Sequence, residues 1–332
     1  MIPESSLDGG CPRIGRRTGM LGYIVRRIIA TIPVAATVGV VVFLLLRLSP
    51  GDPAAVIAGD GAGIEEVARI RTDLGLNQPL YEQFGRWAAN VFQGDLGASI
   101  FSKVAVTELI GQRIGPTLSL TVVTLLMSVA VGVALGLAAA ATAGSFVDHA
   151  LILVAIAGFS APIFVIGYAL VLVFAIDLDW LPVQGYVALS DGLWPFLRHL
   201  ILPSITLSLA YLALISRITR ASVLEILAQD YVRTAYAKGF GEARVFTGHV
   251  LRNAAVPITT IVGIGVALLI SGVVVTESVF NIPGIGRLVV DAISRRDYPV
   301  IQGVTLVFAG IYVLVNLLVD LACGLFDPRI RV

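Results

Sequence analysis

The chain has 332 residues, of which 57% are hydrophobic and 14% are charged, and its mean hydropathy is +0.91. Soluble domains are about 25% charged, so a soluble core could not bury this much apolar surface, and the composition indicates a protein that lies largely in lipid. The net charge of +1 implies no bulk attraction to nucleic acid, and Cys11 and Cys323, near opposite ends, exclude a disulfide framework.

Residues 1–19 are polar and are interrupted by glycine and proline. We expect a disordered N-terminal extension, which would be mobile and cytoplasmic, or an upstream misassigned start. Its deletion is expected to leave assembly and activity unchanged. Residues 20–332 are expected to form one transmembrane domain.

The apolar runs predict six transmembrane helices, because about 20 apolar residues in a helix cross the hydrocarbon core. The first run is too long for a cleavable signal and has no small-residue cleavage site after it. The fourth is the weakest, since it contains Pro203 and Arg217. The predicted spans are 24–46, 117–141, 149–176, 201–219, 254–276 and 301–323.

The long segment 47–116 is expected on the outer face. Its stretches "IEEVARIRTDLGL" and "PLYEQFGRWAANVF" place apolar residues at helical spacing with charges between them. We predict two short amphipathic helices, which form either a solvated cap over the spans or a docking surface for an external partner. In the next span, Gly132, Gly136, Ala140 and Gly144 recur every four residues, which predicts a close helix–helix contact.

The arginines and lysines set the orientation. With the N-terminus inside, 13 of the 23 lie on the cytoplasmic side, and 6 of the other 10 lie in the single long segment 47–116. Six spans then place both termini in the cytoplasm, together with the loop 220–253.

Motifs for a resident cofactor are absent from the sequence: it has no GxxxxGK[ST] phosphate loop, no HExxH and no paired CxxC. His149, His199 and His249 are far apart, so a metal or catalytic role is not expected for them. No carboxylate lies at mid-membrane, where an ion-driven carrier usually needs one. The energy for any transport is therefore expected to come from elsewhere.

Two polar stretches stand between late spans. "DYVRTAYAKGF" (230–240) predicts a short helix, in which Asp230 and Lys238 complement the helix dipole and Gly239 ends the helix in the left-handed conformation. "NIPGIGRLVVDAISRRDYP" predicts a turn at 283–286 and a helix ending near Arg295, with Leu288, Val289, Ala292 and Ile293 on its apolar face. It forms either an ordinary packed loop or part of an outer mouth.

Five segments, in this order and spacing, resemble the inner-membrane permease of the dipeptide/oligopeptide/nickel class of bacterial ABC importers. The resemblance covers about residues 20–332. The segments are "RLSPGDPA" (47–54), "LPVQGY" (181–186), "RTAYAKGFGEARVFTGHVLRNAAVP" (233–257), "ESVFNIPGIGRLVVDAISRRDYPVIQG" (277–303) and "DPRIR" (327–331).

The resemblance implies an all-α permease of the type I importer kind in the bacterial inner membrane. Such a permease pairs with a second homologous permease, two ABC ATPase subunits and an external solute-binding protein, and alternating access moves the solute. ATP and Mg would be bound by the ATPases, and this chain would bind no cofactor or metal and would not be an enzyme. The solute, whether peptide, nickel, glutathione or another, is left open. The alternatives are an ion-gradient-driven carrier and a non-catalytic membrane assembly protein.

The resemblance also assigns 230–240 as the coupling helix that contacts the ATPase. The general Glu-Ala-Ala-x-x-x-Gly pattern falls on Arg233, Thr234, Ala235 and Gly239, so that Arg233 replaces the acid, and Tyr236 stands where this class often has a second arginine. We expect Ala235 and Gly239 to face a groove on the ATPase. The alternative is an ordinary surface helix. The coupling set is Asp230, Arg233, Thr234, Ala235, Lys238 and Gly239, and the expected mouth set is Glu277, Pro283, Gly284, Gly286, Arg287 and Asp291.

Overall fold

The computed structural model describes residues 20–48, 53–58, 61, 63–73 and 75–326. Regular structure in these ranges is helical, and one isolated β-bridge joins Ala98 and Ala105. The all-α architecture expected from the sequence is therefore confirmed. The predicted extension 1–19 and the segment 327–331 lie outside the described residues.

Helices cover all six predicted spans. By length and composition, three described helices can cross a membrane: α5, α8 and the Tyr298–Leu318 part of α13. Helix α11 is a fourth if its two segments, bent by 48° between Val266 and Leu269, cross together. The spans fall on α1 (Met20–Leu48), α5 (Val106–Ala141), α6 (Phe146–Ser160) with α7 (Ile163–Leu170) and the π-helix η1 (Val171–Asp177), α8 (Leu193–Leu227), α11 (Arg252–Val279) and α13 (Tyr298–Phe326).

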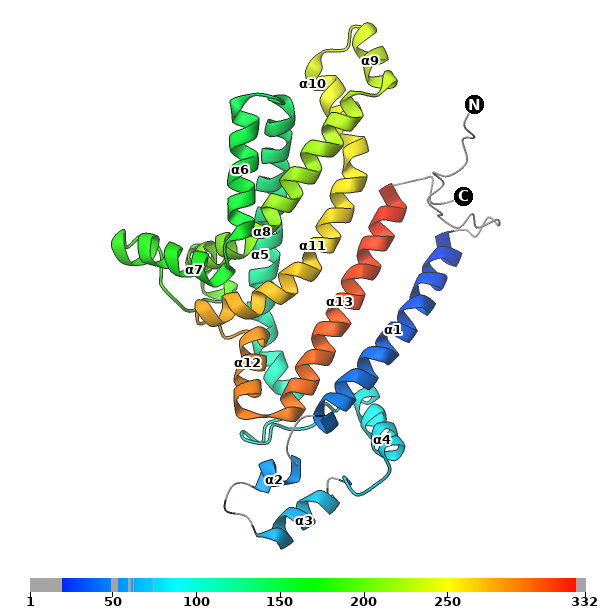
Figure 1. Cartoon of the computed structure of the whole chain (residues 1–332), viewed down its shortest axis with the longest axis vertical. Helices are drawn as coiled ribbons and strands as arrows, with labels where there is room; N and C mark the ends of the chain where they lie inside the picture. The colour runs from blue at the N-terminus through cyan, green and yellow to red at the C-terminus, as the bar shows by residue number, and fades with distance from the viewer. Residues whose placement is uncertain (1–19, 49–52, 59–60, 62, 74, 327–332) are drawn as a thin grey trace, which may run out of the picture.

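The third predicted span is not one continuous helix. Helix α6 ends at Ser160, Ala161 is extended (φ −88°, ψ 139°), and α7 leaves in a different direction after Pro162 (Figure 1). Proline disfavours the helical conformation in the residue before it and donates no backbone hydrogen bond. The prediction of an unbroken 149–176 was wrong because the apolar run hides this break.

The molecule has two distinct ends (Figure 1). The start of α1, the α5–α6 turn and the end of α13 lie toward the end that carries α9 (Asp230–Ala237), α10 (Glu242–Val245) and the π-helix η3 (Phe246–Leu251). Following the orientation expected from the sequence, we call this the cytoplasmic end. The opposite, outer end carries α2 (Pro53–Ala58), α3 (Ile64–Asp73), α4 (Leu80–Phe92) and α12 (Ile285–Arg295), and the short 3-10 helix η2 (Leu189–Asp191) precedes α8. Helices α3 and α4 fall on the two amphipathic stretches predicted in 47–116.

Helices α5 and α8 pack closely along a line of small residues. A Cβ added to Gly132 would lie 2.9 Å from Cγ2 of Ile215, and one added to Gly136 would lie 2.6 Å from the Ser216 carbonyl oxygen. The predicted contact face is confirmed at these glycines. Gly144 does not belong to it: it lies beyond the end of α5 with φ +79° and serves the turn into α6.

The first span joins the bundle through α13 and α4. The Gln302 amide nitrogen donates to the Val42 carbonyl oxygen at 3.1 Å, in a buried contact between α13 and α1. The Phe43 ring meets the rings of Phe84 and Trp87 at centroid distances of 5.3 and 5.6 Å. These aromatic contacts hold α4 against the outer end of α1.

Candidate functional site

The predicted short helix at the cytoplasmic end is α9. Gln229 precedes it in an extended conformation, and the Thr234 hydroxyl donates to the Asp230 carbonyl at 2.8 Å within it. Gly239 has φ +81° and its N–H donates to the Tyr236 carbonyl at 2.9 Å. The left-handed ending predicted for Gly239 is therefore confirmed.

One face of α9 packs into the subunit itself. Val232 has no exposed surface, and Ala235 is only 5% exposed. They join a buried group that we call the cytoplasmic cluster, made of Val223, Val232, Ala235, Val245, Val250 and Ala254 with Ala140 and Ile258. The expectation that Ala235 faces a partner groove was wrong, because its small side chain is buried against the end of α8 and the start of α11.

The other face of α9 is open. Asp230, Arg233, Thr234, Lys238 and Gly239 are exposed, and no atom lies within 4 Å of a Cβ added at Gly239. Arg233 and Asp230 approach only to 3.9 Å, with side chains 74% and 99% exposed, so this pair adds little stability. Five of the six residues proposed for coupling thus share one accessible surface.

Two tyrosines flank that surface. Tyr231 and Tyr236 are 44% and 42% exposed. The Asn253 amide at the start of α11 donates to the Tyr231 hydroxyl at 3.1 Å. An ordered, half-exposed aromatic ring beside charged groups is typical of protein contact surfaces.

A partly buried ion pair ties α8 to the α5–α6 turn at the same end. Arg220 donates to both oxygens of Asp148 at 2.6 Å, and the carboxylate also accepts the Gly144 N–H at 3.0 Å. Asp148 precedes the predicted third span, and the Arg220 hydrogen bond lowers its pKa to about 2, with the Gly144 N–H acting in the same direction. Sequence analysis missed this pair, although Ser145 followed by Asp148 is a recognisable helix start.

At the outer end, Glu277 is the centre of a buried hydrogen-bond network that connects three helices. Its side chain is fully buried; Oε1 accepts the Thr117 hydroxyl at 2.6 Å and Oε2 accepts the Arg287 N–H at 3.0 Å. The Thr117 oxygen in turn accepts the Ile285 N–H at 2.8 Å. A carboxylate and a hydroxyl thereby satisfy free N–H groups at the first turn of α12 and join α5, α11 and α12.

Glycines make room for this carboxylate. A Cβ added at Gly284 would lie 2.0 Å from Oε1 of Glu277, and one at Gly286 would lie 2.6 Å from Cα of Val274. Larger residues at these positions would displace Glu277 or separate α12 from α11. We call Thr117, Glu277, Gly284, Ile285, Gly286 and Arg287 the outer joint.

The expected outer mouth therefore divides into two groups. Glu277, Gly284 and Gly286 are buried, so they line no open path in this conformation, and that part of the prediction was wrong. Pro283 and Asp291 are exposed, and the half-buried Arg287 side chain donates to Asn281. The predicted helix itself is confirmed as α12, although Ile293 is 58% exposed and does not belong to its buried face.

No group of three or more His, Cys, Asp or Glu side chains in the described ranges could hold a metal ion.

The chain matches known transport components along most of its length. A family model for "Binding-protein-dependent transport system inner membrane component" matches residues 132–332, and one for the N-terminal part of such components matches residues 20–121. A "probable peptide ABC transporter permease protein" of Sinorhizobium fredii (strain NBRC 101917 / NGR234) is 57% identical over 309 residues, covering 93% of this chain and 99% of that protein. The "glutathione transport system permease protein" of Escherichia coli (strain K12) is 42% identical over 312 residues, covering 94% and 99%.

A solved structure shares the fold. The MetNI methionine ABC transporter, in an inward-facing conformation, contains a chain that matches with a TM-score of 0.54 and 15% identity, over 66% of this chain and 96% of that one. At this identity the likeness concerns the arrangement of the helices, and it agrees with the type I importer architecture expected from the sequence.

Proposed function

The chain belongs to the family of binding-protein-dependent transport system inner membrane components, and from this membership we propose that it carries peptides or a closely related solute into the cell. It is a multi-pass permease subunit of the bacterial inner membrane and has no enzymatic activity of its own. The relatives named for peptide and glutathione transport support the substrate class, since glutathione is itself a small peptide.

The partners that we propose are a second homologous permease, two ABC ATPase subunits and an external solute-binding protein. ATP and Mg would be bound by the ATPases, because the sequence has no phosphate-binding loop. Cycles of ATP binding and hydrolysis would then switch the permease pair between outward-open and inward-open states.

The open surface of α9 is the observation that supports coupling most directly. Helix α9 belongs to the segment that connects the end of α8 to the start of α11. Its open surface presents charged and aromatic side chains. If a groove on an ATPase subunit held this surface, a movement of that subunit would move α8 and α11 together. Asp230, Arg233, Thr234, Lys238 and Gly239 are the proposed contact residues, and Ala235 supports them from the inner face.

An ion-gradient-driven carrier is not favoured. Such a carrier usually needs a carboxylate that exchanges ions near the middle of the membrane. Among the described carboxylates, Glu277 is fully buried, but it lies at the outer end and holds the first turn of α12. Its oxygens are occupied by structural donors.

Transport in a defined system tests the function. The chain would be reconstituted in liposomes with the permease, ATPases and binding protein encoded beside it, and uptake of labelled dipeptides, tripeptides and reduced glutathione would be measured. We expect uptake of a peptide that requires ATP and is lost when the phosphate-loop lysine of the ATPases is replaced. Uptake driven by an ion gradient without the ATPases would overturn the proposal.

A further inference from the structure

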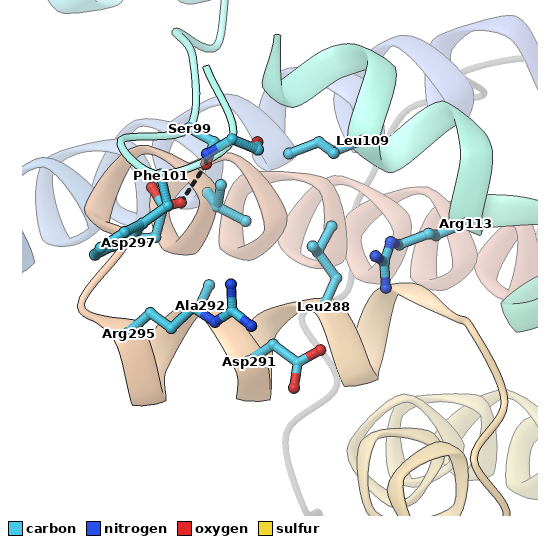
Figure 2. Close-up of a pocket in the computed structure, with 11 residues that line it drawn as sticks. Ser99, Phe101, Leu109, Arg113, Leu288, Asp291, Ala292, Arg295 and Asp297 are labelled. Carbon is cyan, nitrogen blue, oxygen red and sulfur yellow. Dashed lines mark hydrogen bonds between the residues drawn. The ribbon is translucent and has the colours of Figure 1, made fainter. Parts of the chain in front are cut away.

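A polar pocket of about 280 Å³ lies at the outer end, beside the outer joint (Figure 2). The loop 97–105, the start of α5 and helix α12 form its walls. Six of its eleven lining residues are polar or charged. The residues are Ser99, Phe101, Ser102, Leu109, Arg113, Leu288, Asp291, Ala292, Arg295, Asp297 and Val300.

Asp297 fixes the wall that faces the loop. It is 4% exposed; Oδ2 accepts the Ser99 hydroxyl at 2.5 Å, which Figure 2 draws as a dashed line, and Oδ1 accepts the Ile100 N–H at 3.1 Å. Lys103 and Arg296 adopt left-handed φ values of 59° and 58° in the two turns that this carboxylate joins. Residues without glycine's freedom are kept in that conformation only by a well-determined surrounding, so the wall is preorganised.

Two guanidinium groups provide the positive charge of the pocket. Arg113 from α5 and Arg295 from α12 approach it from opposite sides, with Asp291 below them (Figure 2). In the described part of the chain, neither guanidinium has a carboxylate oxygen within 4.0 Å. Lys103 and Arg296, both exposed, directly follow the lining residues Ser102 and Arg295. The charges of the lining residues balance, Arg113 and Arg295 against Asp291 and Asp297. The exposed Lys103 and Arg296 beside them bring the net charge of the pocket and its rim to +2, which favours an anion.

The size of the pocket selects the kind of anion. Sites for whole small molecules are typically about 300–1,000 Å³ and mostly apolar. This pocket is slightly smaller than that range, and six of its eleven lining residues are polar or charged, so it suits a single side chain better than a whole solute. A carboxylate would meet two planar donors there, in the geometry that guanidinium groups recognise.

We propose that this pocket receives an acidic side chain of the external solute-binding protein when that protein docks. The inference rests on the proposed function, because it requires an importer with such a partner. Arg113 lies one helical turn before Thr117, which donates to Glu277 in the outer joint. An acid that binds Arg113 therefore acts directly on the α5 end of the joint, so docking and opening of the outer end are linked through one helix.

Binding of the solute-binding protein to the assembled importer in nanodiscs tests the pocket. Arg113→Gln and Arg295→Gln are each expected to weaken this binding by about tenfold or more, because each removes a charge-assisted contact. Arg295→Lys should retain part of the affinity. Arg198→Gln is the matched control, since Arg198 is an exposed outer-end arginine that donates to the Trp180 carbonyl, away from the pocket. Its binding should equal that of the wild type.

Salt dependence gives a second measurement that needs no variant. Raising the ionic strength should weaken binding of the wild-type importer, and the Gln variants should be less sensitive to salt. Basal ATPase activity without the binding protein should be unchanged in the control Arg198→Gln. Assembly of the complex, followed by size exclusion, shows that the variants fold.

Three results would overturn the pocket assignment while wild-type uptake proceeds: wild-type affinity for the binding protein in both Gln variants, loss of free-peptide binding instead, or loss of pairing with the second permease. The second result would make the pocket a solute subsite, and the third would make it a permease contact. If the wild-type importer shows no ATP-dependent uptake, the proposed function itself fails, and this inference fails with it.

Discussion

At the scale of single residues, Glu277 carries the most structural consequence. Glu277→Ala would leave the Thr117 hydroxyl and the Arg287 N–H without their buried acceptor. Each such loss costs about 1–3 kcal/mol, so we expect lower thermal stability and faster hydrogen exchange of the backbone amides at 285–287. Glu277→Gln should be milder, because its carbonyl oxygen still accepts one donor.

Glu225→Ala is the control for this experiment, since Glu225 is exposed on α8. Its stability and its exchange at 285–287 should match those of the wild type. Protection of the 285–287 amides that survives Glu277→Ala would mean that the outer joint is held by apolar packing alone.

The residue scale also shows where sequence analysis succeeds and where it stops. The left-handed Gly239 and the turn before α12 were predicted because local conformation leaves a local pattern. Thr117 was missed because its partner is 160 residues away, and a lone threonine at the start of a predicted span has no distinguishing neighbours. Ala235 was assigned to the wrong face because an eight-residue helix has too few apolar positions to define its buried side.

At the scale of elements, an alanine-to-tryptophan substitution on each face of α9 should have a different effect: on the exposed face it should impair ATPase binding, and on the buried face it should impair folding. Ala237→Trp adds volume to the exposed side, so the permease should reach the membrane normally but bind the ATPase poorly and transport slowly. Ala235→Trp adds it to the buried side, where overpacking costs about 1–3 kcal/mol, so its membrane level should fall. Membrane level, ATPase co-purification and uptake distinguish the two.

Normal uptake by Ala237→Trp would show that the open face of α9 does not contact the ATPase. Equal membrane levels for the two tryptophan variants would contradict the burial of Ala235. Either result is informative, because the variants share a helix, a residue type and an added volume.

The Asp148–Arg220 pair connects two further elements. Asp148→Asn and Arg220→Gln should each lower thermal stability, and the double variant should lose less than the sum of the two, because each single change leaves a charge without its partner. The pKa of Asp148 is lowered from its ordinary 3.8 to about 2, so its contribution is complete above pH 3.8 and is lost as the pH falls toward 2. The wild-type advantage over Asp148→Asn should therefore be constant at neutral pH; additive effects in the double variant would contradict direct pairing.

At the scale of the whole molecule, the two ends must face opposite sides of the membrane. With Cys11 and Cys323 replaced by serine, Asn90→Cys on α4 should react with an impermeant maleimide in spheroplasts, and Glu225→Cys should react only after permeabilisation. Both side chains are exposed. Labelling in the reverse order would invert the proposed orientation.

The overall architecture was largely predictable, because the apolar runs and their order leave few arrangements of helices. Pro162 signals the break after Ser160 in the sequence, but the span was predicted from hydropathy, which contains no information on backbone geometry. The pocket beside α12 could not be predicted, since Arg113 and Arg295 come together only after the bundle has formed.

The outer joint also has a consequence for the order of events during synthesis. Thr117 and Glu277 are 160 residues apart, and at about 5–20 residues per second the ribosome reaches Glu277 roughly 8–32 s after Thr117. During that interval Thr117 at the outer part of α5 lacks its acceptor Glu277. Helix α8 is made earlier in the same interval and can already pack against the glycines of α5. The outer joint is thus completed late in synthesis, and a chain truncated before Glu277 would expose an α5 end without its partner, which a membrane protease would recognise as unfinished.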